Sequence, residues 1–254
     1  MIVAIAMVCG LLIGSFLTVV IDRVPRGASI VSPGSTCGGC QRQLGPIDLV
    51  PVLSWVFLRG KCRRCGASIG IESVMVELAT AALFVAMMVH FERPVVGAAH
   101  CVLAAGLVAQ TAIDLRTKRL PREITYATIA LGAPLLVISA FVIDEPRRIA
   151  TAVLGAVIAT AVMAALYAVS RGGLGDGDVR LSPLLGLYLG WSNPGAALVG
   201  LFYGFIIGSL VGVILMIAGR AGRRTALPFG PFLAVGCLIA VFQGQSFIDA
   251  VMAR

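Results

Sequence analysis

The chain has little charge and almost no histidine. Only 13% of its 254 residues are charged, and it contains two histidines. Apolar residues make up 59% of the chain and the mean hydropathy is +0.99, whereas soluble domains have roughly 45–50% apolar residues. This balance excludes an ordinary soluble protein and indicates an integral membrane protein. Because His90 and His100 have no clustered partner in the sequence, we expect no histidine metal site.

Signals of several other protein classes are also missing. No basic residue precedes the first apolar segment, 2–22, and no small-residue cleavage site follows it, so we expect a retained membrane span and not a signal peptide. The glycines of residues 172–177 lack the GxGxxG spacing, and no strand precedes them, which argues against a dinucleotide-binding loop. We find no internal repeat of the kind that transporters built from inverted halves carry.

Apolar segments of membrane length fill most of the chain. A helix needs about 20 residues to cross the hydrocarbon core, and the segments of suitable length are 2–22, 72–90, 95–113, 124–143, 149–169, 196–218 and 228–248. A shorter stretch, 179–191, is the uncertain one. We therefore expect an all-α polytopic membrane protein with about eight transmembrane helices. Residues 23–70 form the only sizeable polar segment, a small extramembrane domain between the first and second helices.

The distribution of positive charge predicts the topology. If residues 23–70 are cytoplasmic and the short stretch spans the bilayer, sixteen of the 20 Lys and Arg residues lie in cytoplasmic loops. The positive-inside rule then favours eight spans with both termini outside. The net charge of +8 therefore needs no nucleic-acid partner, and we expect none.

Two aspartates are the candidate catalytic residues. Asp114 ends the third apolar segment, and Asp178 ends the glycine-rich stretch 173–178. Carboxylates at the edge of a bilayer are costly and usually functional, and the predicted topology places both at the cytoplasmic edge. Two carboxylates about 3 Å apart cannot both ionise. One can then activate a water while the other protonates a peptide carbonyl, so the pair predicts an aspartic peptidase.

Each aspartate also has a simpler interpretation. Asp178, or its neighbour Asp176, can be the N-cap of the following helix. Asp114 can pair with Arg116 or Lys118 in a polar loop, an interaction worth ~0–1 kcal/mol. The predicted placement on one membrane face favours a catalytic pair over these alternatives.

Four of the seven cysteines form two Cys-x-x-Cys pairs, Cys37 with Cys40 and Cys62 with Cys65. Four thiolates at this spacing favour a tetrahedral structural zinc site, and disulfides are less favoured in a reducing cytoplasmic loop. A loop this small lacks the apolar residues for its own core, so zinc would supply much of its folding free energy. This divides the chain into a first transmembrane helix (1–22), a cytoplasmic zinc-binding domain (23–70) and a seven-helix membrane peptidase core (71–254).

Three cysteines in apolar segments, Cys9, Cys101 and Cys237, are expected to be packing residues. Glu77 is harder to assign, because a glutamate inside a membrane span is costly. It can pair with an arginine of the polar loop or line the active-site cavity.

The chain resembles the type IV prepilin peptidases, bacterial membrane aspartic proteases, over nearly its whole length. The motifs that carry the resemblance are Gly14–Val20 with Arg23–Arg26, the four cysteines with Asp48–Trp55 and Leu58–Cys62 between them, Asp114 with Leu120–Pro121, Gly175–Leu181, and Leu227–Leu233. The motif match assigns catalysis to Asp114 and Asp178, because Asp176 occupies a variable position.

The resemblance implies cleavage of a short basic leader from prepilin-like substrates, after a glycine, at the cytoplasmic edge of the inner membrane. Pseudopilins of type II secretion belong to the same substrate class. Many family members also methylate the new amino terminus with S-adenosylmethionine, but no residue can be assigned to that cofactor. The expected partners are the prepilin, whose hydrophobic helix docks among the spans, and the lipid bilayer.

The chain departs from the family pattern at three places. Thr18 replaces the usual Asn, Arg180 replaces the usual Lys, and residues 69–73 replace an aromatic-Pro entry to the second span. None of these changes affects the aspartates, so they weaken the expectation of methylation more than that of peptide cleavage. The alternative functions are a proton- or cation-coupled transporter that uses the intramembrane aspartates, and a non-catalytic zinc-dependent membrane scaffold.

Overall fold

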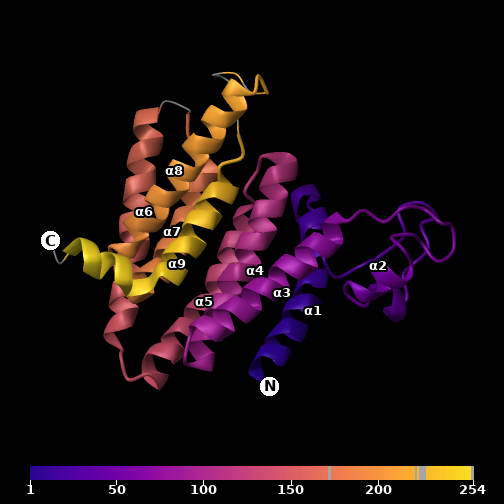
Figure 1. Cartoon of the computed structure of the whole chain (residues 1–254), viewed down its shortest axis with the longest axis horizontal. Coiled ribbons are helices and arrows are strands. Elements are labelled where there is room, and N and C mark those ends of the chain that lie inside the picture. The colour runs from indigo at the N-terminus through magenta and orange to yellow at the C-terminus, as the bar shows by residue number, and fades with distance from the viewer. Residues whose placement is uncertain (171–172, 221, 223–226, 253–254) are drawn as a thin grey trace. The chain divides into compact units, whose positions relative to one another are not determined.

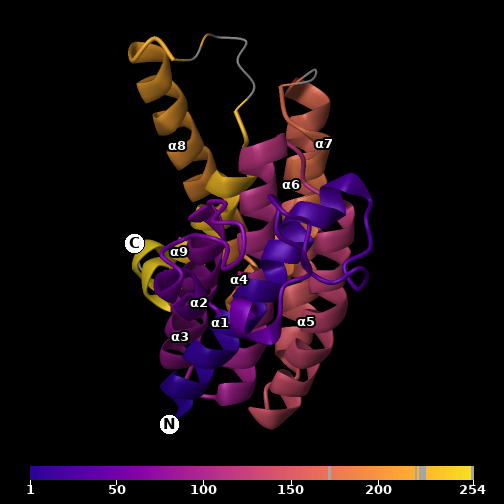
Figure 2. The ribbon, with the colours of Figure 1, turned by 90° about the vertical axis from the view of Figure 1, so that its right-hand side faces the viewer.

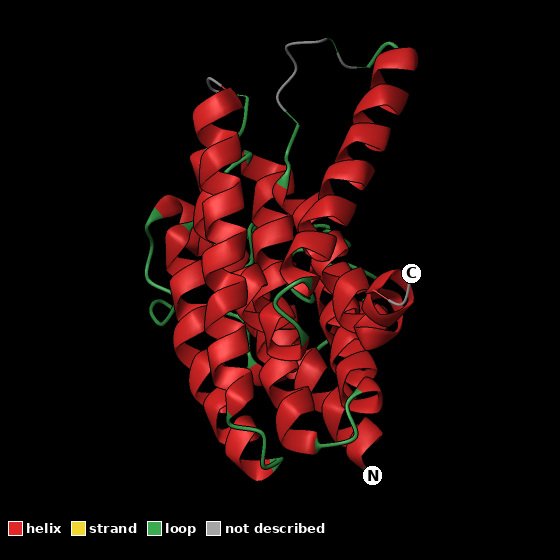
Figure 3. Ribbon diagram, turned by 90° about the vertical axis from the view of Figure 1, so that its left-hand side faces the viewer, coloured by secondary structure: helices red, strands yellow, loops and turns green. Residues whose placement is uncertain are grey.

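The computed structural model describes residues 1–170, 173–220, 222 and 227–252. Helices make up 74% of the chain, and the described residues contain no β-strand, only two isolated β-bridges. Figure 3 shows this all-helical architecture. The prediction of an all-α protein is therefore confirmed.

Each of the eight apolar segments that the sequence predicts to be helical is a helix. In chain order these are α1 (Ile2–Arg23), α3 (Glu72–His90), α4 (Pro94–Thr117), α5 (Arg122–Val142), α6 (Arg147–Ser170), α7 (Asp176–Ser192), α8 (Ala196–Ile217) and α9 (Gly230–Met252). The polar segment between α1 and α3 contains two 3-10 turns, η1 (Val24–Arg26) and η2 (Pro46–Leu49), and the short helix α2 (Leu53–Phe57). Figure 1 shows their arrangement.

Six helices in the described part of the chain are long and apolar enough to cross a membrane, namely α1, α3, α4, α5, α6 and α8. The chain is therefore a multi-pass membrane protein. Helix α7 has 17 residues, fewer than the about 20 that a full span needs, so its crossing stays a prediction. Arg171, Arg223, Arg224 and Arg254, which entered the topology prediction, lie outside the described residues.

The chain forms two compact units, Met1–Ala112 and Ile113–Arg254. In the first unit, α1 packs against α3 through two glycines one helical turn apart. A Cβ atom on Gly10 would lie 2.5 Å from the Ala81 Cα, and one on Gly14 would lie 2.6 Å from the Glu77 Cα. Small residues at this spacing allow membrane helices to approach closely. Gly14 of the first family motif therefore has a packing role.

In the second unit, α7 is the central helix, because it contacts α5, α6, α8 and α9. Its apolar side chains are almost fully buried, among them Leu181, Leu185, Tyr188 and Trp191. A helix that is apolar on all sides is typical of a position surrounded by other helices. Helix α7, which carries Asp178, is thus surrounded by other helices of the same unit.

The α6–α7 contact depends on glycines that let the two backbones touch. A Cβ atom on Gly190 would lie 2.6 Å from the Thr151 carbonyl oxygen and 2.8 Å from the Gly155 Cα. We expect Gly190→Val to lower the thermal midpoint of the purified protein, because overpacking typically costs about 1–3 kcal/mol. Gly212→Val is the matched control, since a Cβ there meets only the Leu227 side chain, at 3.5 Å. Equal midpoints for the two variants would contradict this packing.

Candidate functional site

Asp114 lies in the last turn of α4 and is 4% exposed. The helix ends just beyond it, because Lys118 adopts a positive φ of 54° and donates its backbone N–H to the Asp114 carbonyl oxygen at 2.8 Å. The Asp114 side chain accepts a hydrogen bond at Oδ2 from the Gly230 N–H, at 2.9 Å. The first residue of α9 therefore orients this carboxylate. Asp114 is thus buried, unlike a surface carboxylate in a polar loop.

Asp178 lies in the first turn of α7 and is 5% exposed. The N-cap residue of this helix is Gly175, so neither Asp178 nor Asp176 occupies the N-cap position. The Asp178 carboxylate instead interacts with the backbone N–H of Gly175. The two aspartates have different surroundings. The Asp176 side chain is 64% exposed and pairs with Arg180 at 2.7 Å, whereas Asp178 is buried.

The Leu120 side chain links the surroundings of the two buried aspartates within the second unit. A Cβ atom on Gly177 would lie 3.0 Å from the Leu120 Cβ, and one on Gly230 would lie 2.8 Å from the Leu120 Cδ2. The start of α7 and the start of α9 thus contact the same leucine. The buried carboxyl groups of Asp114 and Asp178 are remote in sequence but are thus next to glycines that adjoin one side chain.

Gly230 is a site residue whose role the sequence did not reveal. Its N–H fixes the Asp114 carboxylate, and a Cβ atom in its place would lie 2.9 Å from the same Oδ2 atom. In the sequence, Gly230 stood out only as part of the motif Leu227–Leu233, which resembles a family motif. Nothing in that motif indicated a hydrogen bond to Asp114.

We expect Gly230→Ala to displace the Asp114 carboxylate and to slow substrate cleavage by up to about 100-fold, as small misplacements of reacting groups do. Cleavage of a substrate by the purified variant would measure the loss. Gly212→Ala, in the same unit, is the control and should keep the normal rate. An unchanged rate for Gly230→Ala would show that this hydrogen bond does not position the site.

The four cysteines of the two Cys-x-x-Cys pairs form a second site, in the first unit. All four Sγ atoms of Cys37, Cys40, Cys62 and Cys65 lie within 4.8 Å of one another. The Cys37 and Cys65 Sγ atoms are 3.7 Å apart, close to the edge of roughly 3.8 Å expected for a tetrahedron with Zn–S bonds of about 2.3 Å. A disulfide needs about 2.05 Å. The cluster can therefore hold a zinc ion.

Two similar turns present these thiols. In the first, Cys37 donates its N–H to the Arg42 carbonyl oxygen at 2.8 Å, and in the second Cys62 donates to the Ala67 carbonyl oxygen at 2.8 Å. Each turn is closed by an isolated bridge, Thr36 with Gln43 and Lys61 with Ser68. The spacing of the two cysteine pairs thus produces two matching halves of the four-cysteine cluster.

The thiols differ in their tendency to ionise. Backbone N–H groups of Cys40 and Gly39 lower the pKa of Cys37 to about 6. The Ala67 N–H stabilises the Cys65 thiolate, but desolvation and the neighbouring sulfur atoms outweigh it and raise the pKa of Cys65 to about 11. Four thiolates this close repel one another, and a divalent cation would offset that repulsion.

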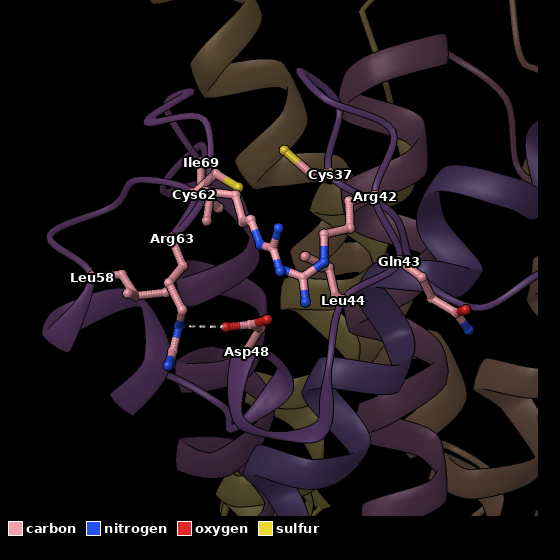
Figure 4. A pocket seen from close by; sticks show the side chains of 10 residues that line it. Cys37, Arg42, Gln43, Leu44, Asp48, Leu58, Cys62, Arg63 and Ile69 are labelled. Atoms are coloured by element: carbon pink, nitrogen blue, oxygen red, sulfur yellow. Dashed lines mark ion pairs between the residues drawn. The ribbon is translucent and has the colours of Figure 1, made fainter.

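A small pocket adjoins the cluster and is lined by Cys37, Cys62, Arg42, Asp48 and Arg63, among others (Figure 4). The Arg63 Nε atom and the Asp48 Oδ1 atom form an ion pair at 3.1 Å, shown dashed in Figure 4. Asp48 also accepts the Gly45 N–H at 3.3 Å. This carboxylate therefore connects η2 to the second cysteine turn.

Glu77 binds the backbone of the polar segment. Its Oε2 atom accepts the N–H of Val52 at 2.7 Å, and the Ser15 hydroxyl of α1 also interacts with this carboxylate. Val52 has a positive φ of 59° just before α2. Glu77 thus joins α1, α3 and the polar segment between them. Its partners among the described residues are a backbone N–H and a hydroxyl group, not the arginine that was one of the two predictions.

Together these features define a multi-pass helical membrane protein with a pair of buried aspartates and a four-cysteine cluster. Two family models match it: the bacterial peptidase A24 N-terminal domain over residues 8–91, and the type IV leader peptidase family over residues 101–217. The chain belongs to the type IV leader peptidase family, and it is a peptidase. The family resemblance seen in the sequence is confirmed.

Curated relatives agree with this assignment, and each is named prepilin leader peptidase/N-methyltransferase. The protein from Bacillus subtilis is 32% identical over 97% of this chain and 96% of its own length. The protein from Burkholderia pseudomallei strain 1026b is 32% identical over 96% of this chain and 86% of its own length. The protein from Myxococcus xanthus is 38% identical over 86% of this chain and 64% of its own length. No solved structure matches the chain.

Proposed function

We propose that the chain is a membrane aspartic endopeptidase that removes a short basic leader from type IV prepilin-like substrates, with Asp114 and Asp178 as its catalytic pair. The observation that carries the proposal is the shared surroundings of these two buried carboxyl groups. Asp178 follows Gly177 and Asp114 accepts the Gly230 N–H, and both glycines adjoin the Leu120 side chain. The names of the relatives supply the class of substrate. Neither the transporter nor the scaffold alternative has support from these relatives.

The pair would divide the work of peptide hydrolysis. Two carboxyl groups that share one site retain one proton between them. The ionised aspartate takes a proton from a water molecule as that water attacks the scissile carbonyl carbon, while the protonated aspartate donates its proton to the carbonyl oxygen. When the tetrahedral intermediate collapses, the C–N bond breaks and the leaving amine takes the proton that the first aspartate received from water. The second aspartate takes back a proton from a hydroxyl group of the intermediate, so the pair again holds one proton. The glycines beside Asp178 would let an extended substrate backbone approach.

The substrate would be a prepilin or a pseudopilin of type II secretion. Its basic leader would stay in the cytoplasm, and its hydrophobic helix would dock among the membrane helices. Cleavage would follow a glycine at the cytoplasmic face of the plasma membrane. In this proposal both aspartates lie at the cytoplasmic face, which is also the face where the positive-inside rule puts most Lys and Arg residues.

The extramembrane segment 23–70 would be a zinc-binding domain, with Cys37, Cys40, Cys62 and Cys65 as ligands to a structural zinc ion. Residues 1–22 would form the first transmembrane helix, and residues 71–254 would form the seven-helix peptidase core. We also propose that the chain N-methylates the new amino terminus with S-adenosylmethionine, as the relatives' name indicates.

Co-expression with a prepilin, in a bacterium that lacks its own prepilin peptidase, tests the proposed function. We expect the pilin to lose its leader only when the chain is present, as a shift in the mass of the pilin. A prepilin in which the glycine before the cleavage site is replaced by a large residue is the control, and it should stay uncleaved. A full-length native prepilin beside well-expressed, membrane-inserted chain would contradict the proposal.

A further inference from the structure

The extramembrane segment presents a group of exposed apolar side chains around α2. Phe57 is 81% exposed and Ile47 is 68% exposed, although both are large apolar residues. We call residues 47–57 the apolar segment, whose exposed apolar residues are Ile47, Leu49, Val50, Leu53, Val56 and Phe57. Soluble surfaces seldom expose so many large apolar side chains together, so such a patch marks an interaction surface.

One hydrogen bond sets the depth of the apolar segment. Glu77 accepts the Val52 N–H at 2.7 Å, and Glu77 lies in the second turn of α3, a helix long and apolar enough to cross the membrane. At a rise of 1.5 Å per residue, this point is about 7–8 Å along the helix axis from the start of α3. Figure 1 draws α2 in the looped region next to α1, and Figure 2 shows the same region from the side. The hydrogen bond therefore holds the apolar segment next to the second turn of α3.

Several polar groups of the apolar segment are satisfied within the protein, as membrane depth requires. Within and after α2, Val56 and Gly60 donate their N–H groups to the carbonyl oxygens of Val52 and Trp55, at 3.0 and 2.8 Å. The Trp55 Nε1 atom donates to the Ile69 carbonyl oxygen at 3.1 Å. This also gives a reason for a glutamate inside a span, because Glu77 supplies the acceptor that water would supply elsewhere.

Positive charge follows the apolar segment directly. Asp48 is its one charged residue, and the next charged residues along the chain are Arg59, Lys61, Arg63 and Arg64. Arg59 and Lys61 are exposed. Apolar and aromatic side chains next to Lys and Arg are typical of segments that lie in the interface of a bilayer containing anionic lipids.

We propose that the apolar segment 47–57 inserts into the headgroup and acyl-chain boundary of the leaflet in which α3 begins, and that Arg59 and Lys61 contact anionic lipid phosphates. The four-cysteine cluster then belongs to a domain anchored to the bilayer surface by its own side chains. This inference depends on α3 spanning the membrane and does not depend on the proposed peptidase activity. The occupant of the apolar surface is lipid, and neither a substrate nor a second copy of the chain is needed to cover it.

Photo-crosslinking of the full chain tests the proposal. Phe57→p-benzoylphenylalanine keeps an aromatic group at an exposed position, and the protein is reconstituted in vesicles of phosphatidylethanolamine and phosphatidylglycerol. Mass spectrometry then identifies what the ketone captures. The lipid-facing control is Phe202→p-benzoylphenylalanine on α8, which is 62% exposed, and the polar control is Ser68→p-benzoylphenylalanine, exposed in the second cysteine turn.

We expect phospholipid adducts at positions 57 and 202 and far fewer at position 68. Adducts at 202 without any at 57 would overturn the proposal, and so would capture at 57 of only a second copy or of an added prepilin. Arg59→Gln with Lys61→Gln should leave the adducts at 57 in place but lower their phosphatidylglycerol share, by up to about fivefold per charge. If the phosphatidylglycerol share of the adducts did not change, Arg59 and Lys61 would not contact anionic lipid phosphates.

Discussion

Leader cleavage is expected to fall by about 100- to 10,000-fold when either Asp114 or Asp178 is replaced by Asn, as when a general acid or base is removed. Asparagine keeps the shape of the side chain but cannot exchange a proton. Both aspartates are buried, and both lie next to glycines that adjoin Leu120. In the proposed mechanism one is the base and the other is the acid, so loss of either stops the reaction. The rate is measured as release of the leader from a prepilin by purified, reconstituted protein.

The matched control is Asp176→Asn, two residues from Asp178 on the same helix. Asp176 is exposed and pairs with Arg180, an interaction worth about 0–1 kcal/mol, so this variant should cleave at nearly the normal rate. If Asp176→Asn were inactive and Asp178→Asn were active, the catalytic residue would be Asp176 and not Asp178. Equal thermal midpoints of the variants would show that the losses arise from chemistry.

Cys62→Ser is expected to abolish metal binding, taking the zinc content from about one ion per chain to almost none. The apparent free energy of structural zinc binding is about 10–16 kcal/mol, and the extramembrane segment has few buried apolar residues to replace it. We therefore expect residues 23–70 to become sensitive to proteolysis, while the membrane helices resist it. Elemental analysis and limited proteolysis measure the two effects.

Two further variants make the zinc prediction specific. Cys9→Ser changes a cysteine of α1 outside the cluster, so it should leave the zinc content unchanged. Cys62→His offers a nitrogen ligand that zinc accepts and should restore part of the metal. Zinc that persists in Cys62→Ser, or that disappears in Cys9→Ser, would place the metal elsewhere in the protein.

The helices and the candidate residues could be predicted because each depends on local sequence. Apolar length alone located α3 and α5 to within a few residues, and the spacing of Cys37, Cys40, Cys62 and Cys65 alone predicted a cluster that the structure assembles. Burial separated Asp178 from Asp176 in agreement with the motif. The catalytic assignment itself stays a prediction.

The contacts that orient these residues could not be predicted, because they join distant parts of the chain. The Gly230 N–H and the Asp114 carboxylate are 116 residues apart, and no periodicity or spacing encodes that pair. The same holds for Glu77 and Val52, which meet only because the polar segment folds back along α3. The central place of α7 depends on glycines in α6 and α7 whose backbones touch.

The most direct test of the catalytic role of Asp114 and Asp178 is the mass of the substrate's amino terminus after incubation with the purified chain in vesicles. We predict a pilin that begins immediately after the glycine at the end of its leader. The native chain and Asp176→Asn should form this product, and Asp114→Asn and Asp178→Asn should not. The same spectrum would show a methyl group on the new amino terminus when S-adenosylmethionine is supplied. Correct cleavage at a near-normal rate by either the Asp114→Asn or the Asp178→Asn protein would contradict the assignment of these two residues as the catalytic pair.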